Sequence, residues 1–500
     1  MVVSEKSMRL DAIPGLLFQG NKRDDDDEIE DVTEKAIEFE FLTMNDFPPL
    51  MHPQPSSKII MVRPCYKVIY GQLLEYLRSD SPRYMGENLT VTGNPGIGKS
   101  RFYLYCIYRF IQDGTGGRQL VINFDGDYHL YDFEKAEFRE LDMNGPDKEI
   151  IQNPNVLRLV EAKSTKLTGW QGISVLFASP GVPGLHQYQK TLNRRKFIMP
   201  VWSFRELEIC NDKQDHPLSS EEFYTEFLLF DGIPRFVFGK DYRSDMRQAV
   251  YSDDVRDLFS FVKSKSPVRD KHYSHLLLKM CPTSESLQLD FYLDFLSDEI
   301  AVRLYNRFEE SCHDQLVSFM IDNMNDPNTA TVRGRFYEVF CHRRFGRGIQ
   351  LTGRHLESID EFKLDIADCV QVRYFSSLAE ITELKAGEYE YFIPHSKSFG
   401  ALDSFYWNGT NCFTCQMTIS ESHPISHAKL KDFIRWFRGL SSGEIFFVFV
   451  VPSRVAISFQ KQQYITSSKT VMKRIASEIL QISQYVVPLD EFEGAHIIQT

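Results

Sequence analysis

The residues with the clearest chemical meaning lie between Val91 and Ser100, in the stretch V-T-G-N-P-G-I-G-K-S. This stretch fits the phosphate-binding pattern G-x-x-x-x-G-K-[ST]. Its glycines allow the backbone to fold into a concave set of N–H groups around phosphate oxygens. The lysine would then reach the β- and γ-phosphates, and the serine hydroxyl would coordinate Mg²⁺. The pattern predicts a nucleotide site formed by Gly93, Asn94, Pro95, Gly96, Ile97, Gly98, Lys99 and Ser100.

The elements on either side of this loop are those that such a site needs. Residues 88–92 alternate apolar and polar side chains, which predicts a strand. Residues 101–112 place apolar side chains on one helical face, so the positive end of a helix would point at the phosphates. The alternative is a chance glycine turn before a surface helix, which we consider the weaker interpretation.

Two later strands are predicted to end in residues that serve the same site. Val156–Glu161 is an apolar strand whose final acid, Glu161, would hold the metal and its water; Asp125 is the alternative acid. Residues 173–179 form the next strand, and Ser179 is placed to sense the γ-phosphate. Either side chain would also suit a strand that simply ends at solvent.

Arginines further along offer phosphate contacts. Arg235 follows a Gly-Ile-Pro break and is expected beside the bound adenine, with its guanidinium toward the phosphates. The basic cluster at 194–196 can serve the same purpose, although a solvated turn is the favoured interpretation.

These motifs, together with P-V-W-S-F-R-E-L at 200–207 and D-G-I-P-R-F-V at 231–237, resemble the ATPase module of Crinkler-type proteins. Retrotransposon-hot-spot proteins share that module. The resemblance covers residues 58–240 and implies a P-loop NTPase of the AAA+/STAND branch that binds ATP and Mg²⁺. The acid at Glu161 departs from the usual Asp of this branch, so hydrolysis is less firmly implied than binding.

A basic segment opens the last part of the chain. Residues 331–354 hold six arginines and one acid, with Tyr337, Phe340 and Phe345 interleaved. Such a segment suits a phosphate backbone. The alternative is a basic helix face that answers the acidic segment 357–390.

A metal site for phosphodiester cleavage is the second chemical prediction. Residues 413–419 read as a buried strand with Gln416 and Thr418 on one face, and Asp403 and Glu338 would converge with them. Carboxylates in such a group hold Mg²⁺, which activates water, and a lysine usually stabilises the developing charge.

The segments G-R-F-Y-E, P-H-S-K-S-F-G-A-L-D-S-F and Q-M-T-I-S-E-S-H-P resemble the nuclease-type domain that follows the ATPase in Crinkler proteins, which is similar to the PD-(D/E)xK fold. The resemblance implies Glu338 as the helix acid, Asp403 as the central ligand, and Gln416-x-Thr418 in place of the acid-x-lysine pair. Gln416 supplies only a neutral carbonyl and Thr418 no positive charge. His423 or Lys397 is an alternative source of that charge.

The domain organisation follows from these assignments. We expect an α/β protein with a flexible acidic leader at 1–57, the P-loop NTPase domain at 58–240, a helical or winged-helix connector at 241–330 and a restriction-endonuclease-like domain at 331–500. In the connector, residues 255–262 and 287–308 have apolar residues at helical spacing.

Charge and cysteine content limit the classes of protein to which the chain can belong. The net charge is −12, of which residues 1–40 contribute −7, with twelve acids against five bases. Asp24–Glu28 therefore reads as a solvated tail. The nine cysteines include one C-x-x-C, at 412 and 415, which we interpret as core thiols rather than zinc ligands. No secretory signal or membrane span is expected. The resemblance implies action in a nucleus, either the cell's own or a host's, and leaves open a homo-oligomer through the ATPase domain.

Two functional hypotheses of different class follow. The first is an ATP-gated, Mg²⁺-dependent endonuclease acting on DNA, with double-stranded DNA the expected form. The second is an ATP-regulated signalling or DNA-binding protein whose nuclease-like domain is inactive. A plain ATPase remodeller is a third, weaker option.

Overall fold

The computed structural model of the 500-residue chain describes most of the sequence. The residues described are 2–6, 39–44, 59–78, 86–124, 126–161, 167–180, 188, 195–239, 242–252, 255, 257–265, 274–288, 290–395, 402–466 and 469–492. The acidic run Asp24–Glu28 and the alternative residues Asp125 and Lys397 lie outside this set.

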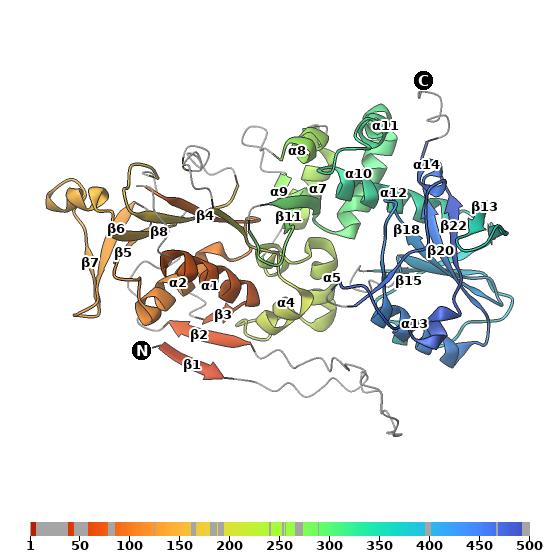
Figure 1. Ribbon diagram of the computed structural model, residues 1–500, viewed down its shortest axis with the longest axis horizontal. Coiled ribbons are helices and arrows are strands. Elements are labelled where there is room, and N and C mark those ends of the chain that lie inside the picture. Colours follow the sequence, from red (N-terminus) through yellow and green to blue (C-terminus); the bar gives the residue numbers. More distant parts are fainter. Residues whose placement is uncertain are drawn as a thin grey trace. The chain divides into compact units, whose positions relative to one another are not determined.

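The chain divides into two compact units (Figure 1). The first comprises Met1–Phe223, Gly232–Gly239 and Met280–Phe291, and the second comprises Tyr224–Asp231, Lys240–Lys279 and Tyr292–Thr500. The first is called the N-terminal unit and the second the C-terminal unit. Most of the expected connector, 241–330, thus belongs to the C-terminal unit instead of forming a unit of its own.

Aromatic packing explains this division. Phe259 stacks on Phe308 and Phe319, with ring centroids 4.3 Å and 4.0 Å apart. Phe336, which the sequence placed in the last domain, meets the edge or face of Phe259, Phe295 and Tyr305. Since these rings form one core, the residues expected to start a new domain at Thr331 share their core with the segment before them.

A seven-stranded sheet organises the N-terminal unit, in the order β10-β4-β9-β8-β5-β6-β7. The first five strands run parallel and β6 and β7 are antiparallel. The strands are β4 (Asn88–Thr92), β5 (Gln119–Phe124), β6 (Asp127–Asp132), β7 (Glu137–Glu140), β8 (Val156–Glu161), β9 (Ile173–Phe177) and β10 (Arg195–Ile198). β4, β8 and β9 are buried along their whole length, as is usual for parallel strands covered on both faces.

The helix predicted at 101–112 is present as α2, which begins at Lys99 and ends at Asp113. The helices of this unit are α1 (Pro64–Arg78), α2 (Lys99–Asp113), the 3₁₀ helix η1 (Pro146–Gln152), α4 (Phe204–Asn211) and α6 (Pro234–Val237); α5 (Ser220–Phe230) follows α4 in the chain. α2 packs on the sheet through Phe102 and Tyr103, whose rings meet Phe177 of β9 edge-on.

The segment 1–57, which the sequence predicted to be a flexible leader, contains two strands. β1 (Val2–Lys6) and β2 (Glu40–Met44) pair antiparallel, and β2 pairs with β3 (Ile59–Val62). Leu42 and Ile60 are buried in this small sheet, so apolar burial offsets the cost of ordering the chain there.

An eight-stranded mixed sheet forms the C-terminal unit, in the order β14-β13-β22-β20-β18-β17-β16-β15. The strands are β13 (Ile349–His355), β14 (Glu361–Ile366), β15 (Gln371–Phe375), β16 (Glu390–Pro394), β17 (Ser404–Trp407), β18 (Cys412–Met417), β20 (Ile445–Val451) and β22 (Gln484–Pro488). Beside it lies the small pair β19 (Ile425–Ser426) and β21 (Tyr464–Ile465). The helices are α7 (Tyr242–Tyr251), α8 (Leu258–Ser264), α9 (Ser274–Leu277), α10 (Asp298–Ser311), α11 (His313–Asp322), α12 (Ala330–Phe345), η3 (Leu378–Glu380), α13 (His427–Leu440), α14 (Ser453–Ala456) and α15 (Ser477–Leu480).

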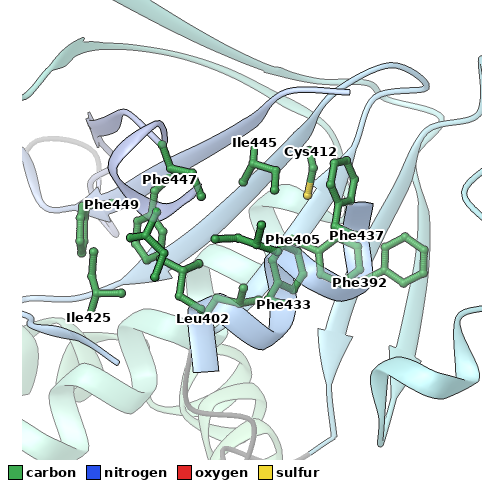
Figure 2. Close-up of a cluster of buried hydrophobic side chains, with 14 of the residues drawn as sticks. Phe392, Leu402, Phe405, Cys412, Ile425, Phe433, Phe437, Ile445, Phe447 and Phe449 are labelled. Carbon is green, nitrogen blue, oxygen red and sulfur yellow. The ribbon is translucent and has the colours of Figure 1, made fainter. Parts of the chain in front are cut away.

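Helix α13 covers one face of this sheet. Figure 2 shows Phe433 and Phe437 of the helix against side chains from neighbouring strands, among them Phe405. The centroids of Phe433 and Phe405 lie 5.4 Å apart in an edge-on arrangement. This core fixes β17 and β18, the strands on which two of the predicted site residues depend.

The predicted helical stretch 287–308 is wrong in its first half. Residues 291–295 form β12 (Phe291–Phe295), which pairs with β11 (Leu278–Pro282), and helix α10 begins only at Asp298. Ser297 caps that helix by accepting a hydrogen bond from the N–H of Ile300. The pattern F-Y-L-D-F suits either period, and the cap decides where the helix starts.

Among the described residues, no helix combines the length and the apolar character needed to cross a bilayer. The broad α/β class expected from the sequence is confirmed.

Candidate functional site

The glycine loop of the N-terminal unit connects β4 directly to α2. Gly93, Gly96 and Gly98 have φ of 152°, 88° and 95°, in the region that favours glycine. A Cβ on Gly93 would stand 2.6 Å from the carbonyl oxygen of Met199, and a Cβ on Gly96 would stand 2.7 Å from the Cβ of Arg235. The loop conformation therefore requires glycine for both backbone angle and space.

The side chain of Lys99 folds back onto this loop and is buried. Its ammonium donates to the carbonyl oxygens of Gly93, at 3.0 Å, and of Asn94, at 2.6 Å. Burial lowers the pKa of Lys99 to about 7, helped by the positive charge of Arg235 and opposed by Glu161. The loop thus holds a buried cation whose positive charge is poorly compensated, which an anion would correct.

Ser100 and Glu161 meet beside this lysine. The Ser100 hydroxyl donates to Oε1 of Glu161 at 3.2 Å, and Glu161 is buried at the end of β8. β9 lies between β4 and β8, and its polar end residue Ser179 follows Phe177 at the same edge of the sheet. Because the carboxyl ends of parallel strands share one edge, Ser179 follows β9 at the edge where Glu161 ends β8 and meets Ser100. The structure brings Arg235 to the same loop, next to Gly96.

Three residues outside the motif hold the loop in place. The Tyr66 hydroxyl donates to the carbonyl oxygen of Gly98 at 3.2 Å, and the Trp202 indole donates to that of Ile97 at 2.8 Å. The side-chain oxygen of Asn94 accepts from the N–H of Met280 at 2.7 Å. Sequence reasoning did not assign Tyr66 or Met280, because their positions along the chain carry no signal of these contacts.

A cavity of about 840 Å³ marks the second candidate site, within the C-terminal unit. Glu338 of α12, Asp403 just before β17 and Gln416 of β18 all line it. Oδ2 of Asp403 accepts hydrogen bonds from the Gln416 amide and from the N–H of Met417, each at 2.7 Å. Three of the four residues predicted for cleavage chemistry therefore share one cavity.

Thr418 does not line this cavity. It follows the end of β18, and its buried hydroxyl accepts from the N–H of Ser420 at 3.1 Å, within the turn that leaves the strand. The strand ends at Met417, two residues earlier than the predicted 413–419, so Thr418 lies in the turn and not beside Gln416 as the sequence suggested. His423 lines the cavity instead.

Burial shifts the pKa values of the two carboxyl groups of this cavity, Glu338 and Asp403, toward the neutral form. It raises the pKa of Glu338 well above the ordinary carboxyl value, and the neighbouring Asp403 raises it further, while Arg335 opposes the shift. Burial also raises the pKa of Asp403, against the hydrogen bond from Met417 and the nearby histidines. Two buried carboxyl groups this close resist carrying two negative charges, and a divalent cation would remove that conflict.

Two of the histidines that line the cavity, His342 and His423, have pKa values shifted toward the neutral form. Burial lowers the pKa of His342 to about 4 and lowers that of His423 as well, with Asp403 opposing both shifts. His342 Nδ1 lies 2.7 Å from the Tyr391 hydroxyl, which donates to Ser404 at 2.8 Å. A neutral imidazole can accept a proton or bind a metal.

Arg333 and Arg354 were predicted to contact a phosphate backbone, but they bind groups of the protein itself. Arg333 is buried and donates to the hydroxyl of Thr329 and the carbonyl of Met324. Arg354 donates to the carbonyls of Ala456 and Phe459. These arginines support the fold and are not presented to a phosphate backbone.

Arg335 and Arg343 pair with acids from the preceding segment. Arg335 forms two hydrogen bonds with Asp294, at 3.1 Å and 3.0 Å, and an ion pair with Asp298 at 3.1 Å. Arg343 pairs with Glu309. Apart from Glu338, 3.9 Å from Arg335, the acids that these two arginines meet belong to residues 294–309 and not to the acidic segment 357–390. Arg344 and Arg347 remain exposed, and Arg347 lines the cavity.

The C-x-x-C cysteines are buried free thiols. Cys412 and Cys415 lie within β18, and neither forms a disulfide. Being three residues apart in a strand, they point to opposite faces, as their interpretation as core residues requires.

The cavity fits a hard cation better than a transition metal. No group of three or more His, Cys, Asp or Glu side chains in the described part of the chain is arranged to hold a metal alone. Mg²⁺, however, is commonly held by one or two carboxylates, with water and substrate oxygens completing the shell. Glu338, Asp403 and the carbonyl of Gln416 would supply such a set.

Comparison with known proteins finds two distantly similar curated proteins. No protein-family model matches the chain. Over 412 residues, 79% of the chain, it is 23% identical to Crinkler effector protein 15 of Phytophthora infestans. Crinkler effector protein 16 of the same organism is likewise 23% identical over 411 residues.

The chain is thus distantly similar to two Crinkler effector proteins over most of its length. It spans just under two thirds of the length of these curated relatives, 64% of the first and 63% of the second. The aligned 79% of the chain is too long to fall within either unit alone.

Proposed function

We propose that this chain is a Crinkler-type effector whose N-terminal unit is a P-loop NTPase of the AAA+/STAND branch. The observation that carries the proposal is Lys99, whose buried ammonium is held on two loop carbonyls beside the Ser100–Glu161 contact. Phosphate would replace those carbonyls as the partner of the ammonium. The name "effector" belongs to its relatives, and extending it to this chain is part of the proposal.

In the proposed cycle, loop N–H groups and Lys99 bind the β- and γ-phosphates. Bound Mg²⁺ would supply charge neutralisation, with Ser100 and Glu161 as its protein ligands. Glu161, released from Ser100, would orient water, Ser179 would contact the γ-phosphate, and Arg235 would approach the phosphates from beside Gly96.

Nucleotide retention tests this proposal. Purified chain should bind a fluorescent ATP analogue, and Lys99→Ala should weaken binding by tenfold or more, because it removes a charge-assisted phosphate contact. Lys213→Ala, which changes an exposed lysine, is the matched control. Equal retention by Lys99→Ala and the native chain would contradict the assignment; loss of turnover in Glu161→Gln with binding kept would support its role.

For the C-terminal unit we propose Mg²⁺-dependent cleavage of DNA. The supporting observation is that Glu338, Asp403 and Gln416 line one cavity with two histidines whose pKa values are lowered by burial. Mg²⁺ held by Asp403, Gln416 and Glu338 would polarise the phosphodiester. His423, which lines the cavity and whose lowered pKa favours the neutral form, would take the proton from the attacking water; it would not supply the positive charge of the missing lysine.

Plasmid nicking tests cleavage. The native chain with Mg²⁺ should nick supercoiled DNA, and Asp403→Ala should abolish nicking. Asp432→Ala, an exposed acid of α13, should leave nicking unchanged. Nicking that persists at the native rate in Asp403→Ala would reject this site.

A second candidate function is an inactive nuclease-like unit that only binds DNA. It is favoured by the neutral amide of Gln416, which donates to Asp403, and by the position of Thr418 outside the cavity. Salt-sensitive DNA binding without cleavage under Mg²⁺ or Mn²⁺ would select this alternative.

Coupling between nucleotide and DNA, and action in a nucleus, complete the proposal. If nucleotide gates cleavage or DNA binding, ATPγS should change the rate or affinity in the native chain and have no effect in Lys99→Ala. A nucleotide effect of equal size in that variant would contradict gating. Fluorescent fusions expressed in plant cells would test the nuclear location.

A further inference from the structure

The C-terminal cavity is the size of a pocket for a small molecule. Its volume of about 840 Å³ falls within the roughly 300–1,000 Å³ typical of ligand sites. Glu338 and Asp403, both partly buried, line it. A paired base inside a duplex, stacked and hydrogen-bonded on both sides, would have to leave the helix to enter such a space.

An exposed aromatic pair stands at this cavity. Tyr374 of β15 is 60% exposed, although it lines the cavity, and its ring stacks on that of His395 with centroids 5.4 Å apart and planes 24° from parallel. His395 also lines the cavity. Flat exposed rings of this kind are the usual platform for the bases of an unpaired strand.

The register of the sheet places Tyr374 on the same face of the sheet as Tyr391, which contacts His342 of the cavity. Tyr374 and Val372 alternate with Arg373, which turns to the other face and pairs with Glu390 at 2.7 Å. Val372 is opposite Tyr391, whose hydroxyl lies 2.7 Å from His342 of the cavity. Tyr374 therefore belongs to the wall of the site and is not an incidental surface residue of an edge strand.

Positive charge elsewhere in the cavity lining suits the backbone of such a strand. Arg347, near the end of α12, lines the cavity and is exposed, whereas Arg343, which also lines it, pairs with Glu309. Ser426, the residue before the 14-residue helix α13, lines it too, so the positive end of that helix also faces the cavity. One wall thus offers stacking and the other offers charge.

We propose that the C-terminal site takes an unpaired nucleic-acid strand, with a base stacked on Tyr374 and the adjacent phosphodiester reaching Glu338 and Asp403. This inference rests on the proposed nucleic-acid function and changes its expected substrate from duplex to single strand. Duplex DNA would be a substrate only where it is frayed, gapped or flipped.

Binding assays on the full chain test the inference. Fluorescence anisotropy would compare a labelled 15-nucleotide single strand, as DNA and as RNA, with the matched duplex, using Ca²⁺ in place of Mg²⁺. At least one single strand should bind about tenfold or more tightly than the duplex. Tyr374→Ala should weaken single-strand binding by about tenfold, while Tyr374→Phe should bind normally because the stacking ring remains.

The control is Tyr389→Ala, which removes a tyrosine that is 40% exposed but lies outside the cavity lining. It should bind like the native chain. Duplex binding as tight as single-strand binding, or a Tyr374→Ala variant with unchanged single-strand affinity, would overturn the inference while leaving a duplex nuclease standing. Absence of binding to any of the three probes would instead reject the nucleic-acid function itself.

Discussion

At the scale of single residues, each site contains ionisable groups whose charge is poorly balanced. The unbalanced charge is positive in the first site and negative in the second. Lys99 is a buried cation without a full anionic partner, and Glu338 and Asp403 are buried carboxyl groups close to each other. Each imbalance is resolved by a ligand of the opposite charge: a phosphate in the first case and a cation in the second. The pKa values of these groups can therefore report on binding.

Nucleotide binding should be accompanied by proton uptake at Lys99. Since its pKa is about 7 without ligand, much of the lysine is neutral at about pH 8, and phosphate would restore the charged form. Calorimetry in two buffers of different ionisation enthalpy should give an uptake that approaches one proton at about pH 8 and falls toward zero near pH 6. Lys99→Met should lack the lysine contribution, and identical uptake in both proteins would contradict it.

The carboxyl pair should make stability depend on pH in a definite direction. A folded-state pKa raised above the unfolded value means that the folded chain holds more protons, so the contribution of Glu338 to stability is lost as pH rises above the ordinary carboxyl value. Glu338→Gln removes this loss. The melting temperature of Glu338→Gln minus that of the native chain should become more positive from about pH 5 to pH 8 without divalent cation.

Mg²⁺ provides the control for that experiment. It should raise the melting temperature of the native chain at about pH 8 more than that of Glu338→Gln, because it binds the charged pair. A difference between the two proteins that is flat with pH, with or without Mg²⁺, would argue against the buried carboxylate conflict.

At the scale of elements, one buried ion pair joins β3 and α1 to α4 in the N-terminal unit. Arg63, fully buried, donates to Glu206 at 2.9 Å and to the carbonyls of Pro200 and Val201. Glu206 also completes the capping box with Ser203 at the start of α4. This pair positions Trp202, which supports the glycine loop.

Breaking this pair should be costly. Arg63→Ala leaves Glu206 buried without its cation, and we expect a loss of about 3–5 kcal/mol in the free energy of unfolding, measured by urea titration. Arg205→Ala, which removes the exposed partner of Glu208, should cost about 1 kcal/mol or less. Similar losses in both variants would show that burial of the pair does not matter.

The glycines of the loop allow a second element-scale test. Gly93→Ala should cost on the order of 1–3 kcal/mol more than Gly114→Ala, as judged by the same titration. Both glycines have positive φ, but a Cβ on Gly93 meets the carbonyl of Met199 and one on Gly114 meets nothing within 4 Å. Equal losses would mean that backbone angle alone sets the requirement.

At the scale of the whole molecule, the units do not follow the linear order of the sequence. The C-terminal unit takes in residues 240–279 because Phe259 stacks on Phe308 and Phe319. Arg335, close to the cavity, depends on Asp294 and Asp298 for its partners. A cut at the boundary suggested by sequence would therefore divide a core.

Truncation tests this boundary. A fragment of residues 331–500 should lack a cooperative thermal transition, because it exposes Phe336 and leaves Arg335 without its acids. A fragment of residues 242–500 retains these partners and should melt cooperatively, as followed by circular dichroism. Cooperative melting of the shorter fragment at the same temperature would show that the preceding segment is dispensable.

The local features of this protein could be predicted from its sequence alone. The strand–glycine loop–helix around Lys99 could be predicted because period-2 and period-3.6 patterns and glycine angles are properties of neighbouring residues. The same holds for β8, which ends in Glu161, and for the burial of Cys412 and Cys415.

Features that depend on distant partners could not be read from the sequence. The sequence had already grouped Glu338, Asp403 and Gln416. The addition of His342, the loss of Thr418 from that group, and the use of Arg333 and Arg335 inside the fold all require the register of the sheet and the acids of other elements. Residues 291–295 became a strand because a partner strand and a later helix cap were available. Side-chain patterns show which face is apolar, but contacts between distant segments set which polar groups meet and which charges are buried.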